Sequence, residues 1–291
     1  MLRVGIIGCG GMGRDHIRRL TEKIQGAEVV AVSDVFEESA KKAAEICGAK
    51  VYTDSRELIN AEDVDAVFIV SPGFAHVDSL LQAIEAGKRI FCEKPLCTTA
   101  EDCLKVVKAE EAAGKHLIQL GFMRRYDKGY QQIKEALATG EYGEPLILHC
   151  THRNPEVGTN YNTPMAVHDT AIHAIDVLHS LVDDDYESAQ VVMPRVTKYS
   201  HSELKDPQIM MLRTKKGVCI DVEVFVNCKF GYDINCEVVC EDGALKMAQP
   251  AYPSIRKNAA VSSAIVDAGF DLSMFKQRLN VTFDWYTSET S

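Results

Sequence analysis

A stretch between residues 168 and 181 carries four polar residues on one side of a segment that is otherwise almost entirely apolar. Asp169, His173, Asp176 and Ser180 follow one another at spacings of 4, 3 and 4, which places them on one face of a helix. A helix that is apolar nearly all round is buried, and buried ionisable residues must be paired. A carboxylate one turn from a histidine fixes the tautomer of its ring. The pattern therefore predicts that His173 is a general base and that Asp169 orients it. The alternative is a structural Asp–His pair.

Lys94 is a second candidate for the chemistry. It lies in Cys92-Glu93-Lys94-Pro95-Leu96, directly after the predicted strand Arg89–Cys92. Ligands of open α/β sheets bind beyond the carboxyl ends of the strands, so Lys94 is expected to face the substrate crevice. The alternative is an ordinary solvated lysine, which is what most lysines are.

A glycine-rich segment near the N-terminus predicts a dinucleotide site. Gly8-Cys9-Gly10-Gly11-Met12-Gly13 fits G-x-G-x-x-G between a predicted strand and a predicted helix. The glycines permit a tight turn, a close approach of the backbone to a pyrophosphate, and close packing of the helix on the sheet. Asp34 ends the next strand, 21 residues after Gly13, and suits the ribose hydroxyls. Because no Arg follows Asp34 directly, the pattern favours NAD over NADP. The alternative is a tight turn without a ligand.

The first 122 residues alternate short apolar strands with helices, which predicts a doubly wound parallel sheet, a Rossmann domain. The expected strands are Arg3–Gly8, Glu28–Ser33, Val64–Ser71, Arg89–Cys92 and Leu117–Gly121, and the expected helices are Met12–Lys23, Glu37–Cys47, Ala75–Ala86 and Thr99–Ala113.

Residues 123–291 predict a second, α+β domain with a mostly antiparallel sheet. Consecutive strands joined by short turns are typical of hairpins. The expected helices are Lys128–Leu137 and Asp169–Leu181, and the expected strands are Pro145–His152, Ala189–Val192, Gln208–Arg213, Gly217–Val226, Asp233–Cys240 and Ala244–Met247.

Composition narrows the class of protein. The net charge of −10 and the scattered Lys and Arg argue against a nucleic-acid partner. Apolar runs are too short to span a membrane, and no secretory signal is visible. The ten cysteines lack a paired CxxC pattern, so we expect reduced thiols in a cytoplasmic protein, most of them packed in the core, and no metal site.

Several segments together resemble one known family. Gly8–Gly13, Glu93-Lys94-Pro95 and the helix with Asp169 and His173 resemble the glucose–fructose oxidoreductase/inositol dehydrogenase/rhizopine catabolism family, Gfo/Idh/MocA. The similarity runs from Met1 to about Met247 and is strongest toward the bacterial inositol dehydrogenases of the family, in the segments Gly121–Asp127, His152–Pro155, Lys205–Ile209 and Phe230–Asp233.

The resemblance implies an activity and a set of site residues. The activity is oxidation of a secondary hydroxyl of myo-inositol to the ketone, with hydride transfer to NAD. The implied catalytic residues are Lys94, Asp169 and His173. The implied polyol contacts are Lys94, Arg124, His152, Asn154, Asp169, His173 and Tyr232. Cofactor contacts are assigned to Gly8, Gly10, Gly11, Met12, Gly13, Asp34, Ser71, Glu93 and Lys94.

Two other functions stay open at this point. One is the oxidation of another cyclic polyol or sugar, such as scyllo-inositol or a pyranose. The other is a non-catalytic NAD-binding sensor, which would bind NAD and form no NADH with any polyol. The resemblance also implies a homo-oligomer, usually a tetramer.

Two departures from the family pattern are visible. Ala174 stands where the inositol dehydrogenases usually carry Glu after the histidine. The similarity also fades after about Ala248, where family members continue into further helices, so we expect these C-terminal helices to be missing.

Overall fold

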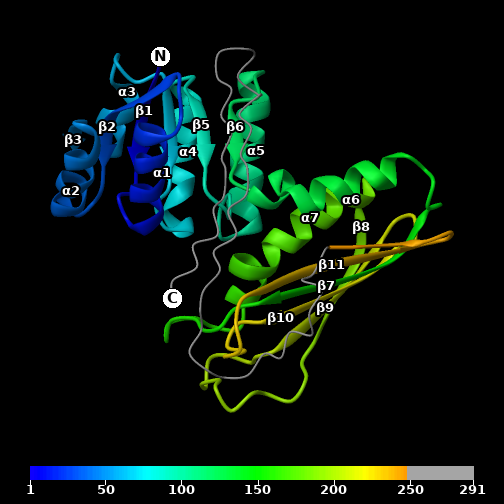
Figure 1. The fold of residues 1–291 in the computed structure, drawn as a ribbon. Helices are drawn as coiled ribbons and strands as arrows, with labels where there is room; N and C mark the ends of the chain where they lie inside the picture. Colours follow the sequence, from blue (N-terminus) through cyan, green and yellow to red (C-terminus); the bar gives the residue numbers. More distant parts are fainter. Residues whose placement is uncertain (248–291) are drawn as a thin grey trace. The chain divides into compact units, whose positions relative to one another are not determined.

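A computed structural model describes residues 1–247 of the chain, which form two compact units, 1–122 and 123–247. Each unit contains one six-stranded sheet (Figure 1). The expectation that C-terminal helices are missing concerns residues 248–291 and lies outside the described residues.

The sheet of the first unit is parallel throughout, with the strand order β3-β2-β1-β4-β5-β6. This confirms the predicted doubly wound sheet. The strand order reverses between β1 and β4, and dinucleotides bind beyond such a switch point. In chain order the elements are β1 (Leu2–Ile7), α1 (Gly11–Glu22), β2 (Ala27–Ser33), α2 (Glu37–Cys47), β3 (Lys50–Tyr52), α3 (Ser55–Asn60), β4 (Ala66–Ile69), the 3₁₀ helix η1 (Gly73–Ala75), α4 (His76–Glu85), β5 (Arg89–Cys92), α5 (Ala100–Ala113) and β6 (Ile118–Leu120).

Sequence patterning missed three short elements, β3, α3 and the 3₁₀ helix η1. The three residues of β3 pair only with β2 at the edge of the sheet, and a run so short shows no alternation. Helix α3 has six residues, too few for a helical period to appear, and begins where the Asp54 side chain accepts a hydrogen bond from the Arg56 N–H.

The second unit contains a mixed sheet of order β12-β11-β7-β10-β9-β8, in which only the β7–β10 pair is parallel. The predicted mostly antiparallel sheet is thus confirmed. In chain order its elements are the 3₁₀ helix η2 (Met123–Tyr126), α6 (Lys128–Ala138), β7 (Pro145–Arg153), the π-helix η3 (Ala166–Ala171), α7 (Ile172–Val182), β8 (Tyr186–Val192), β9 (Gln208–Thr214), β10 (Cys219–Phe225), β11 (Asp233–Cys240) and β12 (Ala244–Lys246).

Helices α6 and α7 lie along one face of this second sheet (Figure 1). The apolar residues of these helices share one core with alternate residues of the strands. This core includes Leu178 of α7, Leu148 of β7 and Ile220 of β10, each fully buried. The opposite sheet face carries polar and charged side chains together with a few exposed apolar ones. Alternation of period two along the strands produces these two faces.

All ten cysteines of the chain are free thiols, and seven of them are buried. This agrees with their expected place in the core. Burial raises the pKa of the Cys9 thiol to about 12, with a further contribution from the charge of Asp34, so the thiol stays protonated beside the glycine-rich loop.

The loop between β1 and α1 is shaped by two glycines that leave no room for a side chain. Gly8 has a φ of +99°, and a Cβ there would lie 2.5 Å from the backbone nitrogen of Ser71. A Cβ on Gly13 would lie 2.0 Å from the carbonyl oxygen of Gly8. Helix α1 therefore approaches the end of β1 as closely as backbone atoms allow.

We predict that Gly13→Ala destabilises the chain, whereas Gly11→Ala does not. Both substitutions gain up to about 1 kcal/mol of helix propensity, but only the methyl group at position 13 meets backbone. We expect Gly13→Ala to lower the free energy of unfolding by about 1–3 kcal/mol, as overpacking does. Urea unfolding of both variants measures this, and equal stabilities would contradict it.

Candidate functional site

The glycine-rich loop fits a dinucleotide. At Gly10 and Gly11 a Cβ would meet nothing within 4 Å, so the backbone at the start of α1 is open to a ligand, in contrast to the crowded Gly8 and Gly13. The first N–H groups of a helix are unpaired and carry a partial positive charge, which suits a pyrophosphate. Met12 is exposed beside this opening.

Asp34, at the end of β2, joins the same site. Its carboxylate accepts hydrogen bonds from the backbone N–H of Cys9 at 2.7 Å and of Phe36 at 2.9 Å. The carboxylate is thus fixed next to the glycine-rich loop, and its remaining lone pairs can accept from ribose hydroxyls. The structure places Asp34 where the sequence pattern expected it.

The loops after β4 and β5 carry the other residues that the sequence assigns to the cofactor. Glu93 accepts a hydrogen bond from the Nε2 of His16 at 2.9 Å and one from the backbone N–H of Lys94 at 3.2 Å. The imidazole of His76 lies between the two loops, with Nδ1 2.8 Å from the carbonyl oxygen of Pro95 and Nε2 2.7 Å from that of Ser71. The backbone on either side of Lys94 is therefore held in place.

Sequence reasoning missed His16 and His76. Both are buried, and each bonds a loop that is distant in sequence, His16 across 77 positions and His76 across 19. A lone histidine on a helix carries no signal of such a partner. The pairing becomes visible only when the sheet places the carboxyl ends of its strands together.

The second unit brings together four of the predicted substrate residues. Arg124 of η2 donates a hydrogen bond from its guanidinium to Nδ1 of His152, at 2.9 Å, and both residues are buried. The ring of His152 has its centroid 6.3 Å from that of His173 and 6.2 Å from that of Tyr232. Arg124, His152, His173 and Tyr232 thus come from η2, β7, α7 and the β10–β11 loop to one place.

Asn154 lies two residues beyond His152. Its backbone N–H donates to the carbonyl oxygen of Phe225 at 2.9 Å, and its carbonyl oxygen accepts from the N–H of Cys228 at 3.1 Å. These bonds extend the parallel β7–β10 pairing past the end of β7 and fix the backbone of Asn154. Its side chain is half-buried.

Asp169 lies in a different local structure from the one predicted. The sequence pattern places it in the first turn of a regular α-helix, but residues 166–171 form the π-helix η3, and α7 begins at Ile172. A π-helix is wider than an α-helix, so the four-residue spacing no longer stacks two side chains directly. His168, to which the pattern assigns no role, donates from Nδ1 to the Asp169 carboxylate at 3.0 Å.

The remainder of the polar stripe on α7, Asp176 and Ser180, is half-buried and paired with other helices. Arg125 of η2 bonds the carboxylate of Asp176 through Nε at 2.7 Å, and this contact raises the pKa of the guanidinium. Lys134 of α6 donates to the hydroxyl of Ser180 at 2.9 Å. No sequence signal connects Arg125 with Asp176, 51 positions away.

The described chain, residues 1–247, contains no cluster of three or more His, Cys, Asp or Glu side chains that could hold a metal ion. Within the same residues, no helix has both the length and the apolar character needed to cross a bilayer.

Comparison with protein families matches both units. The model of an oxidoreductase family with an NAD-binding Rossmann fold, GFO_IDH_MocA, matches residues 2–122. The model of the GFO/IDH/MocA C-terminal domain matches residues 130–246.

Individual relatives and one solved structure agree with this match. The inositol 2-dehydrogenase of Pseudomonas syringae pv. syringae is 53% identical over 91% of this chain and 80% of its own length. An inositol 2-dehydrogenase/D-chiro-inositol 3-dehydrogenase of Halalkalibacterium halodurans is 50% identical over 97% and 80%. The crystal structure of myo-inositol dehydrogenase from Lactobacillus casei in complex with NAD(H) and myo-inositol has a TM-score of 0.84 and 45% identity, covering 89% of this chain and 78% of that one. The chain belongs to the GFO/IDH/MocA family of NAD-binding oxidoreductases.

Proposed function

We propose that this chain catalyses the NAD-dependent oxidation of a secondary hydroxyl group of myo-inositol to the ketone, 2-keto-myo-inositol. The observation that carries the proposal is the convergence of Arg124, His152, His173 and Tyr232 in the second unit. A ring of hydroxyl groups needs several donors and acceptors at once, because each buried hydroxyl left unpaired costs free energy. The relatives that the chain matches carry inositol dehydrogenase names.

His173 acts as the general base in this proposal. It takes the proton of the hydroxyl being oxidised, and the C–H electrons leave as hydride while the C=O bond forms. NAD supplies the hydride acceptor. Asp169 stabilises the charge that develops on His173, and His168 in turn holds Asp169.

Lys94 holds the substrate oxygen by a hydrogen bond and eases its deprotonation in this proposal. Glu93 and His76 bond the backbone on either side of Lys94, so the direction of the lysine side chain is set by a fixed loop. Ordering the loop in advance removes an entropic cost from the reaction.

We predict that His173→Ala abolishes NADH formation from myo-inositol, whereas His179→Ala preserves it. Loss of a general base lowers rates by about a hundredfold to ten-thousandfold. His179 lies on the same helix, half-exposed, with its Nε2 3.6 Å from a carboxylate oxygen of Asp185, and serves as the matched control. NADH absorbance at pH about 8–9, where a histidine of ordinary pKa about 6.5 is neutral, measures the rate. Full activity in His173→Ala would remove the base from the proposal.

A panel of polyols separates the remaining alternatives. Turnover of myo-inositol above scyllo-inositol, D-chiro-inositol and pyranoses supports the proposed substrate. Turnover of another member alone assigns the enzyme to that polyol. A folded protein that binds NAD and forms no NADH with any of them is a sensor.

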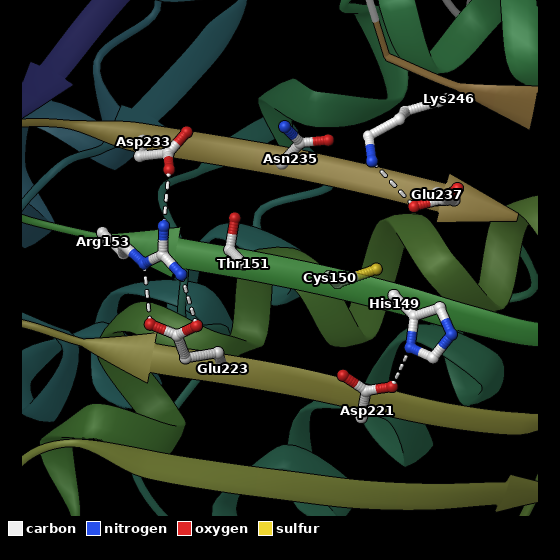
Figure 2. Close-up of a pocket in the computed structure, with 10 residues that line it drawn as sticks. All are labelled: His149, Cys150, Thr151, Arg153, Asp221, Glu223, Asp233, Asn235, Glu237 and Lys246. Atoms are coloured by element: carbon white, nitrogen blue, oxygen red, sulfur yellow. Dashed lines mark hydrogen bonds and ion pairs between the residues drawn. The ribbon is translucent and has the colours of Figure 1, made fainter. Parts of the chain in front are cut away.

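We also propose a homo-oligomer that contacts itself through the outer face of the second sheet, the face opposite α6 and α7. A hollow of about 260 Å³ opens on this face, and Figure 2 shows the charged pairs among the residues that line it. Arg153 bonds Glu223 and Asp233, and Lys246 bonds Glu237. Both signs of charge alternate across the face, which suits a symmetric interface where a patch meets its own copy.

Exposed apolar side chains flank the hollow. Ile147 is 40% exposed, Val192 41% and Met211 41%, and the strand registers place all three on the same face as Asp221. Apolar area beside paired charges is typical of a surface that associates. The resemblance to the family makes a tetramer the expected state.

Free thiols at all ten cysteines fit our further proposal that the chain works in the cytoplasm.

We predict that Met211→Glu lowers the oligomeric mass, whereas Leu104→Glu leaves it unchanged. The new carboxylate lies next to Asp221, and a symmetric contact doubles the repulsion. Leu104 is 58% exposed on α5 of the first unit and serves as the control. Light scattering after size exclusion measures the mass, and a monomeric wild-type protein would contradict the proposal.

A further inference from the structure

The guanidinium of Arg124 has an unusual environment for a buried cation. The residue is 5% exposed, and its side chain donates a hydrogen bond to Nδ1 of His152. Within residues 1–247 no carboxylate forms an ion pair with it, whereas the next residue, Arg125, pairs with Asp176. A neutral imidazole does not neutralise a buried cation. The contact between Arg124 and His152 therefore indicates a role other than charge pairing.

The bond between Arg124 and His152 dictates the protonation of the histidine ring. A guanidinium only donates hydrogen bonds and stays charged at any ordinary pH, so Nδ1 of His152 must be the acceptor. An imidazole whose Nδ1 accepts is neutral and carries its proton on Nε2. Protonation of Nδ1 would break the bond and bring two positive charges into contact, which disfavours the charged ring.

Ring contacts and strand pairing place two ionisable and two apolar side chains around His152. His173 of α7 and Tyr232 of the β10–β11 loop are ionisable, and their ring centroids lie 6.3 and 6.2 Å from that of His152. On the flanking strands its register partners are Val224 of β10 and Ile234 of β11, which are apolar. The carboxylate that η3 carries, that of Asp169, accepts a hydrogen bond from His168.

We propose that Arg124 is a positioning residue that holds His152 as a neutral, Nε2-protonated hydrogen-bond donor to a polyol oxygen next to His173. This role rests on the proposed function, whereas the protonation state of His152 does not. Keeping His152 neutral also keeps a positive charge away from His173, which must stay neutral to accept a proton. Arg124 thus serves the reaction through His152, in addition to any contact of its own with the polyol.

The protonation state is tested first, without any polyol. Nitrogen NMR of the histidine side chains distinguishes an unprotonated Nδ1 from a protonated one, and the spectrum of His152→Gln assigns the signals. We expect Nδ1 of His152 in the wild-type protein to stay unprotonated from pH 8 down to at least pH 5, below the ordinary histidine pKa of about 6.5. Titration near pH 6.5, or a proton on Nδ1, would overturn the proposal.

Variants test the cause. We expect His152 in Arg124→Met to titrate near its ordinary pKa of about 6.5, and in Arg125→Lys, which keeps a cation beside Asp176, to behave as in the wild-type protein. Unchanged behaviour in a folded Arg124→Met would show that Arg124 does not control the ring. The wild-type titration decides the protonation state by itself if Arg124→Met fails to fold.

Kinetics test the role in the reaction. Arg124→Met should raise the KM for the polyol more than about tenfold, the equivalent of one good hydrogen bond to a charged or buried group, with the KM for NAD unchanged. Arg124→Lys, which keeps a cationic donor, should recover part of this loss, and Arg125→Lys, which keeps the ion pair with Asp176, should show wild-type constants. If the NMR result holds and the KM for the polyol does not change in Arg124→Met, the positioning role is wrong. An inactive wild-type protein with the expected NMR result would instead count against the proposed function.

Discussion

The requirement that buried ionisable side chains be paired organises the second unit. Helix α7 carries the carboxylate of Asp176 to the edge of an apolar core, where a charged group needs a partner from another element. The short helix η2 supplies two consecutive arginines that point to different partners: Arg125 neutralises Asp176, and Arg124 bonds His152. Arg124 and His152, which the sequence assigned only to contacts with a ligand, therefore also hold each other in position. The site is thus ordered before a substrate arrives.

The first unit is organised by close backbone contact instead of charge. Gly8 and Gly13 bring the start of α1 against the ends of β1 and β4, and the same contact leaves Gly10 and Gly11 open to a ligand. Asp34 then ties the loop to β2 through the N–H of Cys9. Tight packing on one side of the loop and open space on the other are what a pyrophosphate site needs, because its donors are backbone N–H groups.

Most of the architecture follows from patterns along the chain, and the exceptions have physical causes. The parallel sheet was predictable because its strands are short apolar runs separated by helices with clear periods. The edge strand β3 and the short helix α3 were not, because three and six residues are too few to show a period. The π-helix η3 was also missed, since a wider turn inserted before α7 changes no residue type in the sequence.

The sequence by itself determined the glycine-rich loop with Asp34, the two kinds of sheet, and the residue types that could bind NAD and a polyol. These features depend on local spacing and on the alternation of apolar residues, which the order of residues records directly. Only the tertiary structure decided the partners: Arg124 with His152, Arg125 with Asp176, His168 with Asp169, and His76 between the loops after β4 and β5. Apart from the neighbouring His168 and Asp169, these contacts join residues from separate elements, and a side chain's partner across the fold is set by how the elements pack, which local sequence does not encode.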